Sequence, residues 1–219
     1  MVKGQNMQAR ISNKILVIAI LLIGLGGLFA VKFNPPKPVE LESGFLFPEA
    51  FELAPFELVD QQQKPFTNAN LKDQWSLFFI GFTYCPDVCP TTLNKLAAAY
   101  PELKKIAPIQ IVFLSVDPKR DTPEKLLTYV NFFNPEFKAV TGEQTQIFPL
   151  TRSLGLTYAM VGEGDNYQVD HSAGYVLVSP QGTRVAVFKP TAALGKAPQV
   201  LNQALISDFD KIVKSYKPK

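Results

Sequence analysis

The sequence predicts an α/β fold in which a central mixed β-sheet carries helices on both faces. Two near-continuous apolar runs, residues 75–82 and 109–116, are typical of strands that are buried on both faces. Between them, residues 91–105 have apolar side chains at helical spacing. Strand, helix and strand in this order form a βαβ unit, whose strands pair in parallel. Residues 175–178 and 184–188 flank Ser-Pro-Gln-Gly, which indicates an antiparallel hairpin and therefore a mixed sheet.

The first element along the chain is an uncharged apolar run, residues 15–31. Seventeen residues is about the lower limit for a membrane-spanning helix. Lys3, Arg10 and Lys14 precede the run without any acidic residue, and cytoplasmic flanks carry such an excess of basic residues. We therefore expect residues 1–14 in the cytoplasm, a transmembrane anchor at residues 15–33, and the rest of the chain on the outer side.

A cleaved signal peptide is the alternative reading of this run. Cleavage requires small residues at the first and third positions before the cut. A cut after Ala30 would place Leu28 at the third position, so we favour the anchor. Export of the domain is expected in both cases, and it makes a disulfide between Cys85 and Cys89 chemically permissible.

The segment after the anchor, residues 34–48, contains three prolines and predicts a semi-rigid linker. The folded domain is expected over residues 49–217. It should open with a hairpin formed by residues 56–60 and the turn-rich segment 61–66. No phosphate-binding loop or dinucleotide fingerprint occurs in the domain. The net charge of +3, without a basic helix face, argues against nucleic-acid binding.

Three further helices complete the prediction. Thr122 is a suitable N-cap and Pro123 suits the first helical position. Residues 143–154 predict a second helix, and residues 198–216 close the chain as a third. One face of the closing helix is apolar, and it comprises Leu201, Ala204, Leu205, Phe209, Ile212, Val213 and Tyr216.

The chain contains only two cysteines and one histidine, which are the candidate site residues. Cys85 and Cys89 lie in the segment Gly81-Phe-Thr-Tyr-Cys-Pro-Asp-Val-Cys-Pro. His171 precedes an apolar strand at residues 173–178. Two thiolates and an imidazole are a soft ligand set that suits Cu(I), although zinc also accepts it. The hypothesis requires the fold to bring His171 to the cysteines.

The strand order places these residues at one edge of the sheet. Cys85 follows the end of the first buried strand and Asp117 follows the end of its parallel neighbour, so they share the carboxyl edge where ligands gather. Thioredoxin-like folds place their reactive cysteines at this position, and we predict that fold. Cys89 should lie near the helix N-cap, where the helix dipole lowers the pKa of a thiol. We interpret Asp117 as a turn or capping residue before Pro118.

Each candidate has a purely structural alternative. The cysteines could form a structural disulfide, but a five-residue loop gains little loop-closure entropy. Three residues separate them, whereas redox motifs of the thioredoxin type have two, so the spacing leaves room for an ion. His171 could be a solvent-facing loop residue, and the residues alone leave both readings open.

Three motifs of the sequence together resemble those of the Sco/SenC family. They are the cysteine segment, Ser115-Val-Asp-Pro-Lys-Arg-Asp-Thr122, and Asp170-His171-Ser172 followed by Ser179-Pro-Gln-Gly182. The resemblance covers about residues 48–216 behind an N-terminal membrane anchor. It implies a thioredoxin-like domain that binds one copper ion, Cu(I) or Cu(II), through Cys85, Cys89 and His171.

The resemblance also implies partners and a location. The partner would be cytochrome c oxidase subunit II, to whose binuclear copper centre the protein delivers copper or whose cysteines it reduces. Other copper chaperones are further expected partners. The anchor would lie in a bacterial inner membrane, with the domain facing the periplasm.

Other functions use the same residues differently. A thiol-disulfide oxidoreductase would need Cys85 and Cys89 but no histidine. A peroxiredoxin would need Pro-x-x-x-Thr-x-x-Cys, whereas Phe78 and Phe82 occupy the proline and threonine positions before Cys85. We therefore predict a metallochaperone rather than an enzyme, with thiol-disulfide reduction as the alternative.

Overall fold

The computed structural model describes residues 16–23, 39–162, 164, 167–193 and 196–217 of the chain. The chain divides into two compact units, residues 1–38 and 39–219. In the first unit, residues 16–23 are helical. Residues 1–14, most of the predicted anchor 15–33 and residues 34–38 of the predicted linker lie outside the described residues. None of the helices that the structure describes has the length and apolar content needed to cross a membrane.

The second unit is built on an eight-stranded sheet with the strand order β1-β10-β9-β4-β5-β6-β2-β3. β4, β5 and β6 are parallel neighbours, and the other pairs are antiparallel, so the predicted mixed sheet is confirmed. The strands of this sheet are β1 (Gly44–Glu52), β2 (Glu57–Asp60), β3 (Pro65–Thr67), β4 (Trp75–Gly81), β5 (Ile109–Ser115), β6 (Lys138–Thr141), β9 (Tyr175–Val178) and β10 (Thr183–Phe188).

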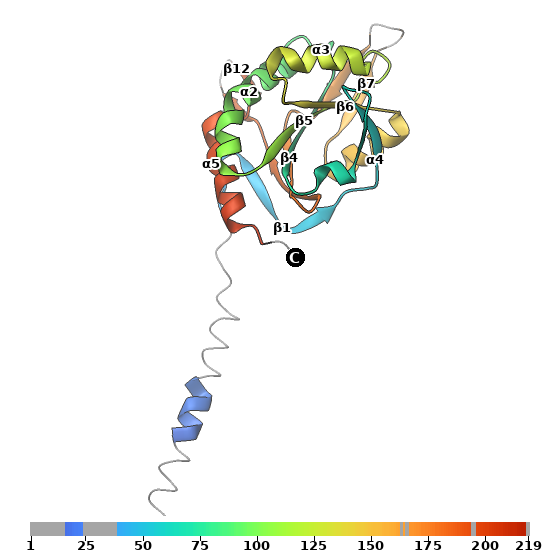
Figure 1. Cartoon of the computed structure of the whole chain (residues 1–219). Coiled ribbons are helices and arrows are strands. Elements are labelled where there is room, and N and C mark those ends of the chain that lie inside the picture. The colour runs from blue at the N-terminus through green and yellow to red at the C-terminus, as the bar shows by residue number, and fades with distance from the viewer. Residues whose placement is uncertain (1–15, 24–38, 163, 165–166, 194–195, 218–219) are drawn as a thin grey trace, which may run out of the picture. The chain divides into compact units, whose positions relative to one another are not determined.

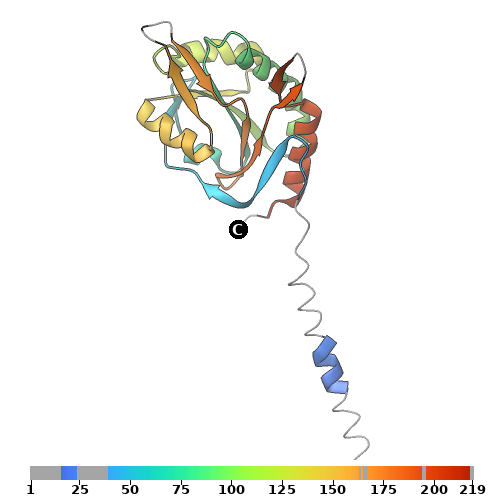
Figure 2. The same cartoon turned by 180° about the vertical axis from the view of Figure 1, so that it is seen from behind.

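Two short hairpins lie outside this sheet. They are β7 (Tyr158–Val161) with β8 (Gln168–His171), and β11 (Thr191–Ala193) with β12 (Lys196–Gln199). The helices of the unit are η1 (Asn68–Leu71), α2 (Val88–Ile106), α3 (Pro123–Phe133), α4 (Gln144–Leu154) and α5 (Asn202–Ser215). Figures 1 and 2 view the unit from opposite sides and show that the sheet lies between the helices.

The two faces of the sheet bury two separate hydrophobic cores. Alternate residues of β4 point to opposite faces, as the period of a strand requires. Leu77 and Phe79 enter the core beneath α2, α3 and α5, while Phe78 and Ile80 enter the core beneath α4. Helices on both faces were predicted, and this arrangement confirms them.

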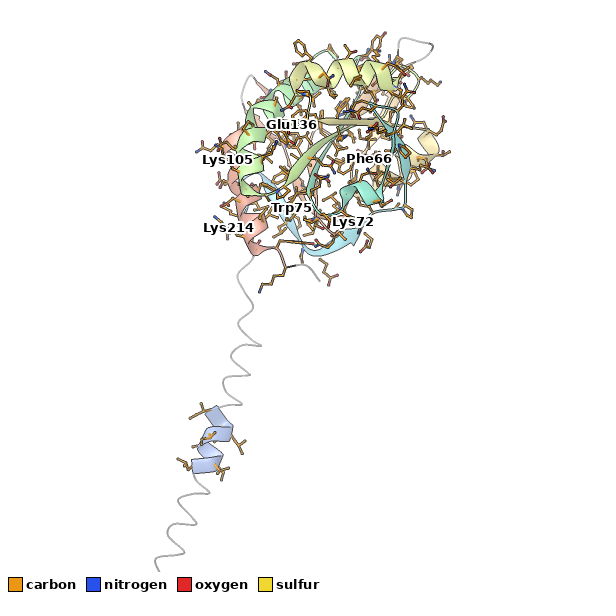
Figure 3. All side chains as sticks on the ribbon, in the orientation of Figure 1. Phe66, Lys72, Trp75, Lys105, Glu136 and Lys214 are labelled. Atoms are coloured by element: carbon orange, nitrogen blue, oxygen red, sulfur yellow. The ribbon has the colours of Figure 1, made fainter. Side chains whose placement is uncertain are left out.

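Trp75, at the start of β4, fixes α5 against the first core. Its ring meets the rings of Phe209 and Tyr216 edge to face, with centroids 5.7 and 5.0 Å apart. Figure 3 shows Trp75 inside the unit, whereas the labelled Lys105 and Lys214 point outward from the helices. The apolar face predicted for the closing helix therefore packs on the sheet, except at Leu201, which precedes α5 and is exposed.

Several boundaries differ from the sequence prediction. α2 begins at Val88, before the predicted residue 91, because Pro90 falls in the first helical turn, where a missing amide hydrogen breaks no helical bond. α3 begins as predicted, with Thr122 capping and Pro123 at the first position. Residues 44–48, which were placed in the linker, belong to β1, and Gly44, Phe45 and Leu46 pair with β10, so the sheet begins before residue 49.

Candidate metal centre

The cysteine segment connects the carboxyl end of β4 to the first turn of α2. The amide of Cys85 donates to the Phe82 carbonyl at 3.2 Å, which closes a tight turn. The amide of Cys89, in the first turn of α2, donates to the Sγ of Cys85 at 3.4 Å. Cys85 is half-buried and Cys89 is fully buried, and both are free thiols. One sulfur is therefore accessible while the other lies inside the first core.

Gly81, the last residue of β4, makes room for Cys89. A Cβ at this position would lie 2.6 Å from the Cys89 Sγ and 2.9 Å from the Phe113 ring. Both distances are well below van der Waals contact, so any larger residue would push α2 away from the strand. Glycine here allows the buried sulfur to approach the end of the sheet.

His171 is the last residue of β8, and its ring faces the buried sulfur. Its Nε2 lies 3.4 Å from the Cys89 Sγ, and its Nδ1 lies 3.0 Å from the Ser172 carbonyl oxygen. A carbonyl oxygen only accepts hydrogen bonds, so Nδ1 of the neutral ring carries the proton. The lone pair of Nε2 then points toward the sulfur, which is the tautomer that a metal ligand needs.

Two aromatic rings fix the plane of the imidazole. The rings of Phe79 and Phe82 meet the His171 ring nearly edge to face, with centroids 6.0 and 6.1 Å away. The ring is half-buried between the end of β4 and the β7–β8 hairpin. The apolar contacts therefore hold His171 toward the cysteines rather than toward solvent.

The three candidate ligands converge as predicted. The Sγ atoms of Cys85 and Cys89 and a ring nitrogen of His171 lie within 4.8 Å of one another. His171 is more than eighty residues from the cysteines in sequence, so convergence had to come from the fold. The prediction that the fold brings His171 to the cysteines is confirmed, while ligation of a metal stays a prediction.

The two thiols have opposite electrostatic environments. The pKa of Cys85 is lowered to about 3, mainly because the Cys89 thiol donates to its sulfur, with backbone amides adding to the effect. The pKa of Cys89 is raised, because it donates to the Cys85 thiolate and lies in the apolar core. The expectation of a lowered pKa at Cys89 is wrong, since the amides of the helix N-terminus point at Cys85.

Two aspartates, Asp117 and Asp121, lie beside the site but are not among the three candidate ligands. Asp121 is buried and accepts hydrogen bonds from the Thr83 amide at 2.9 Å and the Ser115 hydroxyl at 2.6 Å. It thereby ties the cysteine loop to the end of β5. Asp117 is also buried, and its main-chain carbonyl accepts the amides of Arg120 and Asp121, as expected of a turn residue.

The sequence analysis missed Arg120 and Asp121 as residues of the site. The available signal was a cluster of charged residues directly after a buried strand, in Asp117-Pro-Lys-Arg-Asp121. Charges in that position must either face solvent or pair with one another. The structure shows the second outcome, since the Arg120 Nε donates to the Asp117 carboxylate at 2.5 Å.

Fold and site together define a class of protein. A mixed α/β domain with two free thiols and an imidazole at the carboxyl edge of its parallel strands is a thioredoxin-like protein with a group of side chains that could hold a soft metal ion. The SCO1/SenC family model matches residues 48–205. The chain belongs to the SCO1/SenC family.

Individual relatives agree with this assignment. The SCO2-like protein of Rickettsia prowazekii is 39% identical over 189 residues, covering 83% of this chain and 91% of that protein. The crystal structure of Arabidopsis thaliana ScoI with copper bound is 34% identical, with a TM-score of 0.65, and the match covers 74% of this chain and 98% of that one. Yeast Sco1 with copper bound is 29% identical, with a TM-score of 0.65, and the match covers 76% and 91%.

Proposed function

We propose that this protein is a copper metallochaperone that carries one copper ion on Cys85, Cys89 and His171. The observation that carries the proposal is the convergence of the three ligand atoms within 4.8 Å. Two thiolates and one imidazole match the preference of Cu(I) for soft ligands. Structures of the relatives from Arabidopsis thaliana and yeast are described with copper bound, which supports the same cargo here.

The environment of the site suits a carrier that must release its ion. Cys85 is half-buried, so ligands of a receiving protein can approach the metal from that side. Its low thiol pKa keeps the sulfur deprotonated without metal, so loading does not require removal of a proton from it. Cys89 and His171 are held by the core and by aromatic rings, which preorganises the remaining ligands.

The same proposal includes a location and a recipient. Residues 1–14 would be cytoplasmic, residues 15–33 would anchor the chain in a bacterial inner membrane, and residues 34–48 would link the anchor to a copper-binding domain over residues 49–217 in the periplasm. The recipient would be the binuclear copper centre of cytochrome c oxidase subunit II, with other copper chaperones as further partners. The support is the apolar, uncharged run at residues 15–31 and family membership.

Anaerobic copper loading tests the proposal directly. The wild-type protein should bind one Cu(I) per chain, with two thiols titratable before loading and none after. His171→Ala should retain both thiols but bind copper at least about tenfold more weakly, because one of three ligands is lost. Met160→Ala, on the outer strand of the hairpin, is the control. An unchanged affinity in His171→Ala would remove the three-ligand site.

Thiol-disulfide reduction is the second candidate, and the environment of the two thiols favours it. Both thiols are free and Cys85 has a strongly lowered pKa, as a nucleophilic thiol requires. The Cys85 thiolate would attack a disulfide of the partner, and Cys89 would then displace the partner's sulfur. The two cysteines are oxidised to a disulfide while the partner gains two thiols. If His171→Ala supports oxidase assembly in cells and both cysteines are essential, this function replaces copper delivery.

A further inference from the structure

The histidine-bearing hairpin is held to the rest of the unit largely by side chains. β7 and β8 form a separate two-stranded sheet rather than joining the eight-stranded one. A two-stranded hairpin alone is only marginally stable in water. The position of His171 at its end therefore depends on what fixes the hairpin against the sheet.

Arg120 contacts this hairpin at the start of β8, at the opposite end of that strand from His171. Its Nη1 donates to the Tyr167 carbonyl at 3.0 Å, directly before β8 begins. Its guanidinium also lies over the Tyr167 ring, 3.8 Å from the centroid. The Tyr167 hydroxyl donates to Asp117 at 2.5 Å, and Asp117 also accepts from Arg120. We call Asp117, Arg120 and Tyr167 the Arg120 cluster.

The other contacts of Arg120 reach the cysteine segment. Its guanidinium lies 5.0 Å from the ring centroid of Tyr84, the neighbour of Cys85, and 5.7 Å from that of Phe82. Phe82 in turn packs against the His171 ring. Lys125 reinforces this side, since its Nζ lies over the Tyr84 ring at 3.9 Å and donates to the Arg120 carbonyl at 3.0 Å.

The burial of the cluster makes these contacts strong. The Asp117 side chain is fully buried and that of Arg120 is 17% exposed. Ion pairs in such surroundings are poorly screened by solvent and salt. A planar guanidinium can satisfy a carboxylate and a carbonyl while stacking on an aromatic ring, which a lysine cannot do.

From this geometry we infer that Arg120 is a positioning residue that joins the His171 hairpin to the cysteine segment and so sets the three-ligand site. The inference rests on the proposed function for its copper readout. The inference goes beyond the proposed function, because it assigns the geometry of the site to residues that bear no ligand atom. Groups that orient metal ligands from outside typically change metal affinity by about 10–100-fold when they are replaced.

The test uses the full chain, purified without a histidine tag, so that His171 is the only histidine. One variant is Arg120→Met, which keeps an apolar stem. The second is the double variant Asp117→Asn with Arg120→Met, which leaves no unpaired buried carboxylate. Arg152→Met is the matched control, since Arg152 also lies over an aromatic ring, that of Phe148, at 5.6 Å, but on α4.

Two readouts are measured for each variant. The first is the rate at which diethylpyrocarbonate modifies His171 in metal-free protein, which should rise about fivefold or more when the hairpin opens more often. The second is the Cu(I) dissociation constant from competition with a chromogenic chelator, which should rise about 10–100-fold. The control should leave both values within twofold of wild type.

The outcomes separate the inference from the proposed function. Unchanged modification rate and affinity in the double variant would overturn the role of Arg120, whether or not wild-type protein binds copper. Loss of the fold in both variants would also overturn it, because Arg120 would then stabilise the whole unit. If wild-type protein binds no copper, the proposed function fails, and the modification rate still decides the positioning role.

Discussion

At the scale of residues, the two cysteines differ in burial and in the protonation of their thiols. Cys89 is buried and its thiol pKa is raised, whereas Cys85 is half-buried and its thiol pKa is lowered to about 3. The Cys89 amide donates to the Cys85 sulfur at 3.4 Å, and the Cys89 thiol also donates to it, so the negative charge lies on Cys85. Cys85 is therefore the sulfur that meets a partner or reagent first.

This asymmetry predicts an unusual pH profile for alkylation of Cys85. An ordinary thiol has a pKa near 9, so its reaction with iodoacetamide accelerates about tenfold per pH unit below that value. With a pKa of about 3, Cys85 is already a thiolate at pH 5, so its rate should stay nearly flat from pH 5 to 8. Mass spectrometry of metal-free, anaerobic protein measures the rate at each cysteine.

The control for this profile is Cys89→Ala. The largest cause of the lowered pKa is the hydrogen bond from the Cys89 side chain, so its removal should raise the pKa of Cys85 and restore pH dependence. A tenfold rise per pH unit in the wild-type protein would show that Cys85 is an ordinary thiol.

Residue types in the sequence predicted the candidate ligands but not their support. Cys85, Cys89 and His171 are conspicuous because the chain holds no other cysteine or histidine. Arg120 has no such distinction among 22 basic residues, and its role depends on contacts with Tyr84 and Tyr167 that are distant in sequence. Which thiol becomes the anion depends on where one amide points, and spacing alone does not fix that direction.

At the scale of elements, the site depends on the close approach of β4 and α2. Gly81→Ala should weaken copper binding at least about tenfold, because the added methyl group would displace the Cys89 sulfur. Overpacking of this kind typically costs about 1–3 kcal/mol of folding free energy. Copper competition and urea unfolding measure the two effects.

Gly142→Ala is the matched control for this substitution. Its Cβ would meet the Leu58 side chain at 2.8 Å, a comparable clash directly after β6 and two strands away from β4 in the sheet. It should lose stability and keep copper affinity. If both variants lose affinity equally, the effect belongs to general destabilisation rather than to the approach of β4 and α2.

Elements with strong patterns were predicted, and the hairpin that carries His171 was not. β4, α2 and β5 have long apolar patterns because both sheet faces are buried. In the β7–β8 hairpin, by contrast, Val169 is the buried residue of β8, and Met160 and Val161 of β7 are exposed. A hairpin with so few buried apolar residues lacks the apolar-polar alternation that predicts a strand from sequence, so its position depends on tertiary contacts.

At the scale of the whole molecule, the 39–219 unit is closed by a buried acid on its last helix. Asp208 of α5 accepts hydrogen bonds from the Glu42 amide, the Ser43 amide and the Ser43 hydroxyl, at 2.8, 2.8 and 2.9 Å. These bonds hold the segment before β1 against α5. Sequence patterns placed the boundary of the domain at residue 49, because neither Glu42 and Ser43 nor Asp208 belongs to a pattern that predicts such a contact.

The position of this boundary predicts different stabilities for two fragments. A fragment beginning at Val39 keeps the partners of Asp208, whereas one beginning at Glu49 lacks Glu42 and Ser43 and leaves the Asp208 carboxylate with Lys211 as its partner, at 3.6 Å. Breaking buried charged contacts on one side costs about 3–5 kcal/mol, so the shorter fragment should unfold at markedly lower urea. In the longer fragment, Asp208→Ala should reproduce part of that loss of stability without any truncation. The control is Asp210→Ala, which removes an exposed ion pair with Lys214 and should cost less than about 1 kcal/mol. Equal midpoints for the two fragments would place the start of the folded unit at residue 49 and make the contacts of Asp208 dispensable.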